Sequence, residues 1–96
     1  MSDTFSGRVR ILDLNGMLID VGKGNLHVLD PDSGSSWGGT IRVFVNASLT
    51  SKSVESILVL ENGNRTRALV GPQVGDVVDG ELVDVRVVAL ETDVPF

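Results

Sequence analysis

The chain has 96 residues, no cysteine and a formal net charge of −5. This length predicts one domain, 1–96, that buries its own core, and the lack of cysteine excludes disulfide frameworks, thiolate metal sites and cysteine nucleophiles. The acidic balance disfavours non-specific binding to the phosphate backbone of nucleic acids.

No apolar run reaches the roughly 18 residues that a membrane-spanning helix requires. The first ten residues also lack the charged and then apolar layout of a secretion signal. We therefore expect a cytoplasmic protein with no membrane contact.

Valine makes up 16 of the 96 residues and recurs in short alternating runs, which indicates strands because its branched side chain suits a pleated sheet. The first strands are expected at 4–14 and 17–21. Asn15-Gly16 lies between them and is typical of a type I′ hairpin turn. A second turn is expected at 22–25, followed by a strand at 26–29.

The middle of the chain is less regular. Its Pro, Asp, Ser and Gly content predicts a loop at 30–39, before a strand at 40–45. A polar connection at 46–53 leads to a strand at 54–60. The apolar spacing of 54–61 also fits a helix, so a short helix within 46–58 stays open.

Asn62-Gly63 predicts a second tight turn, before strands at 65–70 and 82–90. The segment 71–76 is expected to interrupt the strand pattern, and 91–96 to form a loose tail. Six or seven short strands with tight turns predict an all-β fold, an antiparallel meander closed into a small barrel, because closure removes exposed edges. A two-layer sandwich is the alternative.

Six arginines fall on expected strands, opposite the main apolar face: Arg8, Arg10, Arg42, Arg65, Arg67 and Arg86. They are candidates for an anion-binding or nucleic-acid-binding patch, because guanidinium groups bind phosphate and carboxylate in a bidentate manner. The competing interpretation is cross-strand pairing with carboxylates on the same strands.

The side of the expected sheet opposite the main apolar face also carries apolar residues, more than a monomer would expose to water. The candidate interaction surface comprises Phe44, Leu69, Trp37 and Ile57. We expect a homo-oligomer or a protein partner to cover it. A bulge that turns some of these side chains inward is the alternative.

Trp37 lies in the expected loop, where it either stacks on a partner or plugs one end of the barrel. Asp30-x-Asp32-x-Gly34 resembles the start of a calcium loop, but position twelve is Ile41 instead of a bidentate Glu, so an Asx turn is the better interpretation. His27 is the only histidine and is expected on a strand.

No phosphate-binding glycine loop and no nucleophile elbow are present in the sequence. We therefore predict no catalytic residues, no cofactor and no metal. The expected function is a non-catalytic binding or assembly module. The alternatives are an anion-binding or nucleic-acid-binding barrel and a small enzyme or carrier with an internal site.

Overall fold

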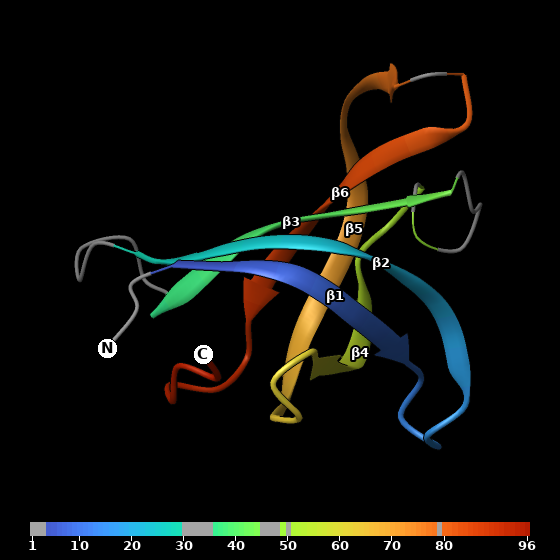
Figure 1. Ribbon diagram of the computed structural model, residues 1–96. Helices are drawn as coiled ribbons and strands as arrows, with labels where there is room; N and C mark the ends of the chain where they lie inside the picture. The colour runs from blue at the N-terminus through green and yellow to red at the C-terminus, as the bar shows by residue number, and fades with distance from the viewer. Residues whose placement is uncertain (1–3, 30–35, 45–48, 50, 79) are drawn as a thin grey trace.

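The computed structural model describes residues 4–29, 36–44, 49, 51–78 and 80–96. Within them the fold is all-β, in agreement with the sequence pattern (Figure 1). The strands are β1 (Thr4–Leu12), β2 (Leu18–Val28), β3 (Trp37–Phe44), β4 (Val54–Leu60), β5 (Arg65–Val78) and β6 (Leu82–Ala89).

All strand pairs are antiparallel, and the spatial order is β1-β2-β3-β6-β5-β4. Two three-stranded units, β1-β2-β3 and β4-β5-β6, are joined by β3 with β6 and by β1 with β4, which closes a ring of hydrogen bonds. This order departs from the expected simple meander, because β6, and not β4, lies beside β3.

The prediction of a turn at 22–25 is wrong, because β2 runs unbroken through this segment. Gly22 pairs with Val9, and Gly24 pairs with Gly7. A Cβ added at Gly22 would approach the Ile41 side chain to 2.7 Å. Glycine is therefore required here for close approach between neighbouring strands and not for a turn.

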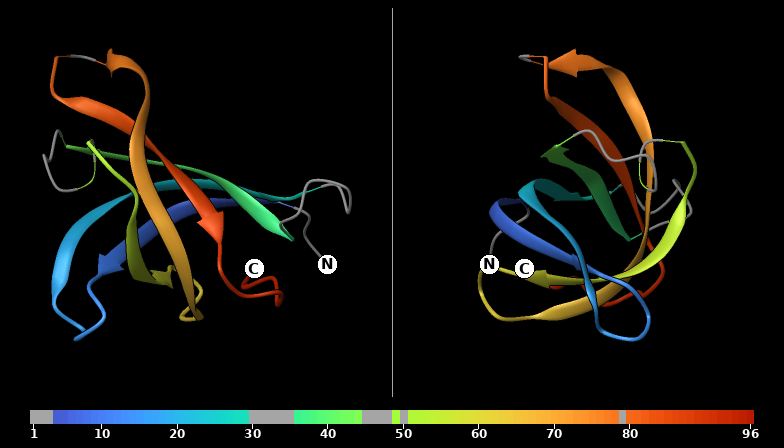
Figure 2. Two further views of the ribbon diagram at one scale, coloured as in Figure 1. Left: turned by 180° about the vertical axis from the view of Figure 1, so that it is seen from behind. Right: turned by 90° about the vertical axis from the view of Figure 1, so that its right-hand side faces the viewer.

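The segment 71–76 bends β5 and does not end it. Gly71 has a φ of 96°, and the Gly71–Pro72 peptide is cis. The pairing of β5 with β6 shifts register between Val70 and Gln73 and again between Val74 and Val78, as at β-bulges. The far end of the β5–β6 hairpin consequently projects from the rest of the sheet (Figures 1 and 2).

The expected loop 30–39 extends too far toward the C-terminus, because β3 already begins at Trp37. The Trp37 side chain is also fully buried. The Asp30, Asp32 and Gly34 motif lies outside the described residues. β4 forms a strand over Val54–Leu60, as predicted. Part of the expected connection, 45–48 and 50, also lies outside the described residues.

The core lies on the inner face of the ring. Along β1, β4 and β6 the buried residues recur at every second position, as the alternating sequence predicts. The buried hydrophobic residues are Val9, Ile11, Leu26, Trp37, Ile41, Val43, Leu49, Leu58, Leu60, Ala68, Val70, Val83, Val85 and Val87.

The end of the chain, expected to be loose, contacts the core. The side-chain amides of Asn62 and Asn64 donate hydrogen bonds to the Pro95 carbonyl, at 3.1 and 2.8 Å. Pro95 is buried, and the Phe96 ring lies edge-on to Trp37 with the ring centroids 6.3 Å apart. The β4–β5 turn therefore holds the tail across one end of the ring.

Candidate interaction face

The strand registers place the outward side chains of β2, β1, β4 and β5 in rows. Outward residues on paired strands lie beside one another across the sheet, because side chains alternate between its faces. The first row is Leu18, Leu12, Ile57 and Arg67, and the second is Val21, Arg10, Val59 and Arg65. We call these eight residues the outer face.

The outer face is apolar and cationic at once. Five of its eight members are aliphatic, three are arginine, and none is a carboxylate. This composition contrasts with a chain whose net charge is −5. Carboxylates lie at its border: Glu61 lines a hollow together with Arg10 and Val59, and the Arg67 backbone N–H donates a hydrogen bond to the Glu91 carboxylate at 2.8 Å.

Several aliphatic members of this face meet water. Leu18 is 58% exposed and Val21 is 37% exposed, whereas Leu12, Ile57 and Val59 are half-buried. Leu14 and Met17, in the adjoining β1–β2 turn, are 54% and 69% exposed. A contiguous exposed apolar surface of this kind is typical of a protein contact site.

A row of three cations borders the outer face. Arg8 on β1 lies directly opposite Lys23 on β2, and Lys23 lies opposite Arg42 on β3. Like charges in directly opposed positions are destabilising. The Arg42 guanidinium binds the Asp84 carboxylate at 3.0 and 3.3 Å, and this is the one ion pair within the described part of the chain.

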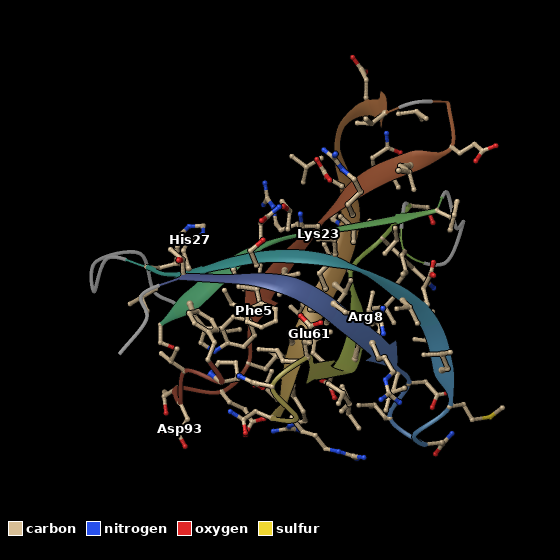
Figure 3. All side chains as sticks on the ribbon, in the orientation of Figure 1. Phe5, Arg8, Lys23, His27, Glu61 and Asp93 are labelled. Atoms are coloured by element: carbon tan, nitrogen blue, oxygen red, sulfur yellow. The ribbon has the colours of Figure 1, made fainter. Side chains whose placement is uncertain are left out.

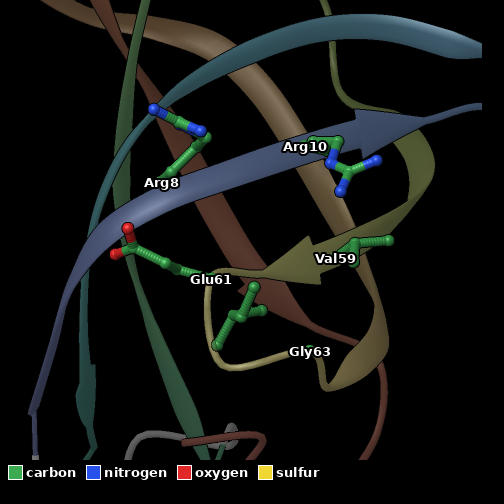
Figure 4. A pocket seen from close by; sticks show the side chains of 6 residues that line it. Arg8, Arg10, Val59, Glu61 and Gly63 are labelled. Carbon is green, nitrogen blue, oxygen red and sulfur yellow. The ribbon is translucent and has the colours of Figure 1, made fainter.

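Two shallow hollows lie on either side of Arg8. The first has a volume of about 190 Å³ and is lined by Arg8, Arg10, Val59, Leu60, Glu61 and Gly63 (Figure 4). The second, of about 340 Å³, is lined by Gly7, Arg8, Val21, Gly22, Lys23 and Glu61. Both hollows therefore open beside the outer face, and both are lined by the cation Arg8 and the carboxylate of Glu61.

Glu61 follows the last residue of β4, where β1 loses that strand as its partner. β4 pairs with β1 only from Val9 to Leu12. The Glu61 carboxylate points toward β1, close to Gly7, while the Arg8 side chain lies beyond the β1 ribbon (Figures 3 and 4). A side chain on Gly7 would meet this carboxylate, so glycine at position 7 leaves room for Glu61.

The structure separates the four residues of the predicted interaction surface. Ile57 lies on the outer face, and the half-buried Leu69 is its diagonal neighbour on β5. Phe44 is 60% exposed but lies on β3, beside Leu82 of β6. Trp37 is fully buried and cannot belong to an exposed surface.

The six arginines are all exposed, but they do not form one patch. Three of them belong to the outer face and Arg8 borders it. Arg42 is engaged with Asp84, and Arg86 lies on β6 opposite Thr40. The expected cross-strand pairing with carboxylates is therefore seen for Arg42 with Asp84.

The sequence pattern does not reveal the grouping of the outer face. Val21 stood at the end of an expected strand, and its place beside Arg10 follows from the continuous β2. The pairing of Arg10 with Val59 joins strands that are far apart in the sequence. The alternation of the sequence predicts which side chains point outward, but it does not predict which outward side chains lie beside one another.

No group of three His, Cys, Asp or Glu side chains suited to a metal ion occurs within the described ranges. His27 lies exposed on β2, opposite Thr4 and Gly38. In the same part of the chain, no helix has the length and apolar character needed to cross a bilayer. Comparison with family models, curated proteins and solved structures found no match.

Proposed function

We propose that this chain is a small β-barrel that acts as a non-catalytic assembly module in the cytoplasm. Copies of the chain associate through the outer face, and a second copy of the chain is the partner. The contact buries the aliphatic side chains of both rows and leaves the arginines to fix its orientation.

The observation that carries this proposal is the composition of the outer face: five aliphatic residues, three arginines and no carboxylate. Burial of apolar surface contributes about 25 cal/mol for each Å² removed from water. Arginine is enriched at protein interfaces because its planar guanidinium group pairs with carboxylates and packs on apolar surface.

The test places a charge on the outer face. Leu18→Glu puts a carboxylate at a position that is 58% exposed in the single chain, so the fold should persist while association is lost. Val28→Glu is the matched control, because Val28 lies on the same strand, is 42% exposed and is outside the outer face. Sedimentation velocity measures the mass, and circular dichroism checks the fold.

We expect Leu18→Glu to sediment as a 10.2 kDa monomer and Val28→Glu to assemble as the wild type does. If both variants assemble equally, the outer face is not the contact surface. If Leu18→Glu loses its β spectrum, Val21→Glu repeats the test at a second exposed position.

A second function is favoured by the row of Arg8, Lys23 and Arg42. Arg8 and Lys23 lie directly opposite each other, which an anionic ligand would stabilise. In this case a single-stranded oligonucleotide binds at low salt, and Arg8→Ala and Lys23→Ala weaken the binding as salt does. If a labelled probe shows no shift at low salt, this alternative is excluded. The net charge of −5 already disfavours it.

A further inference from the structure

We infer that the outer face of one copy binds the acidic end of the β5–β6 hairpin of a second copy, in a head-to-tail arrangement. This inference rests on the proposed function and names the surface that covers the outer face. It concerns the projecting end of the β5–β6 hairpin, residues 72–78 and 80–82, which we call the hairpin end.

The hairpin end complements the outer face in charge. Its described residues include Asp76 and Glu81 and neither lysine nor arginine. Asp76 and Glu81 are exposed. The outer face carries three arginines without a carboxylate, so opposite charges meet when the two surfaces come together.

The hairpin end also complements the outer face in apolar character. Val74 and Val77 are 40% and 46% exposed, and Val78 and Leu82 are half-buried cross-strand neighbours. A two-stranded ribbon that projects from the sheet gains burial for these side chains by docking on the aliphatic rows of another copy. The two surfaces therefore match each other both in charge and in apolar character.

A symmetric contact between two outer faces is disfavoured by charge. A twofold interface uses the same patch on both copies, so the arginines of one face would approach those of the other with no carboxylate among them. Like charges brought together at an interface disfavour association. A contact between two different surfaces avoids this cost.

The two surfaces lie apart on one molecule. β5 carries Arg65 and Arg67 at its start and Val77 near its end. The hairpin end and the β1–β2 turn lie at opposite ends of the fold in all views (Figures 1 and 2). Each copy thus offers its hairpin end to one neighbouring copy and its outer face to another. Repetition of this contact generates a closed ring or an open chain of copies.

Two double variants test this arrangement. Arg10→Glu with Arg65→Glu reverses the charge of the outer face, and Asp76→Lys with Glu81→Lys reverses that of the hairpin end. All four positions are exposed, so both proteins should keep the wild-type circular dichroism spectrum. Lys52→Glu with Arg86→Glu is the net-charge control for the outer-face variant, because it also replaces two cations with carboxylates, at exposed positions outside the two surfaces.

We expect each double variant to sediment as a monomer alone and the control to assemble as the wild type does. The equimolar mixture of the two double variants should assemble again and exceed the 10.2 kDa mass of one chain. In that mixture the intact hairpin end of one variant meets the intact outer face of the other, and the two reversed surfaces, now basic and acidic, are complementary to each other as well.

The failures of the two proposals are distinguishable. If the hairpin variant assembles like the wild type while the outer-face variant is monomeric, the head-to-tail arrangement is wrong and the outer face remains a contact surface. If the mixture stays monomeric, the two surfaces do not meet and the inference is overturned. If the outer-face variant itself assembles, the proposed function fails as well.

Discussion

At the residue scale, the row of Arg8, Lys23 and Arg42 brings like charges together on neighbouring strands of the sheet. Three cations stand directly opposite one another on β1, β2 and β3, and Asp84 binds Arg42. Lys23 thus has a like charge on either side. The isolated chain loses stability at this point because such pairs repel each other.

Lys23→Glu should stabilise the monomer. The substitution turns both cross-strand neighbours into opposite-charge pairs, each worth about 0.2–1 kcal/mol. We expect the free energy of unfolding to rise by about 1 kcal/mol at low salt and by less at high salt, where the charges are screened.

Urea unfolding of dilute protein measures this effect, with Lys52→Glu as a control of equal charge change at an exposed position. A Lys23→Glu variant no more stable than Lys52→Glu would show that the opposed charges carry no strain.

Individual residues also explain which turns the sequence predicts correctly. Tight turns are confirmed at both Asn-Gly pairs, with Gly16 and Gly63 at φ of 88° and 91°. The Gly16 N–H donates to the Asp13 carbonyl, so the centre of the first turn is 14–15 and the expected type I′ turn centred on Asn15-Gly16 is wrong. Gly22 misled the prediction, because a glycine in a strand marks either a turn or a close approach between strands. The two cases differ only in the tertiary neighbours, here Ile41 and Val43.

At the scale of elements, the end of the chain works as a cover for the ring. Phe96 contacts two aromatic rings, Phe5 at 6.2 Å and Trp37 at 6.3 Å between centroids. Asn62 and Asn64 hold the preceding carbonyl of Pro95. Composition suggested a loose tail, because the partners that order it lie far from it in the sequence, in β1, in β3 and in the β4–β5 turn.

Phe96→Ala should loosen this cover. Aromatic pairs contribute about 0.5–1.5 kcal/mol each, so we expect a loss of about 2 kcal/mol in the free energy of unfolding. Trp37 is the only tryptophan and is fully buried, so its fluorescence emission should shift to the red. Phe44→Ala is the control, since Phe44 is 60% exposed and should change neither quantity appreciably.

An unchanged Trp37 emission in Phe96→Ala, with stability equal to that of Phe44→Ala, would contradict this role of the tail. A loss of stability without a red shift would show that Phe96 stabilises the fold without shielding Trp37 from water. Both outcomes are read from the same unfolding curve.

At the scale of the whole molecule, alternation in the sequence predicts an all-β chain but not the order of its strands. The closure of β1 against β4 sets Arg10 beside Val59, and this juxtaposition creates the outer face. Of the predicted surface residues, Ile57 lies on that face and Trp37 lies in the core. The reason is that register, and not periodicity, decides which outward residues become neighbours.

The segregation of charge is likewise a property of the whole molecule. The chain is acidic overall, yet the outer face is cationic, and the projecting hairpin end is acidic without a basic residue. A molecule with opposite charges on separate surfaces attracts its own copies most strongly at low ionic strength.

Sedimentation velocity of the wild-type chain over a series of concentrations tests the assembly function most directly. At tens of micromolar and low salt, the mass should exceed the 10.2 kDa of one chain, and it should fall toward that value on dilution and on addition of salt. A mass of 10.2 kDa at every concentration and every salt level would contradict self-association through the outer face.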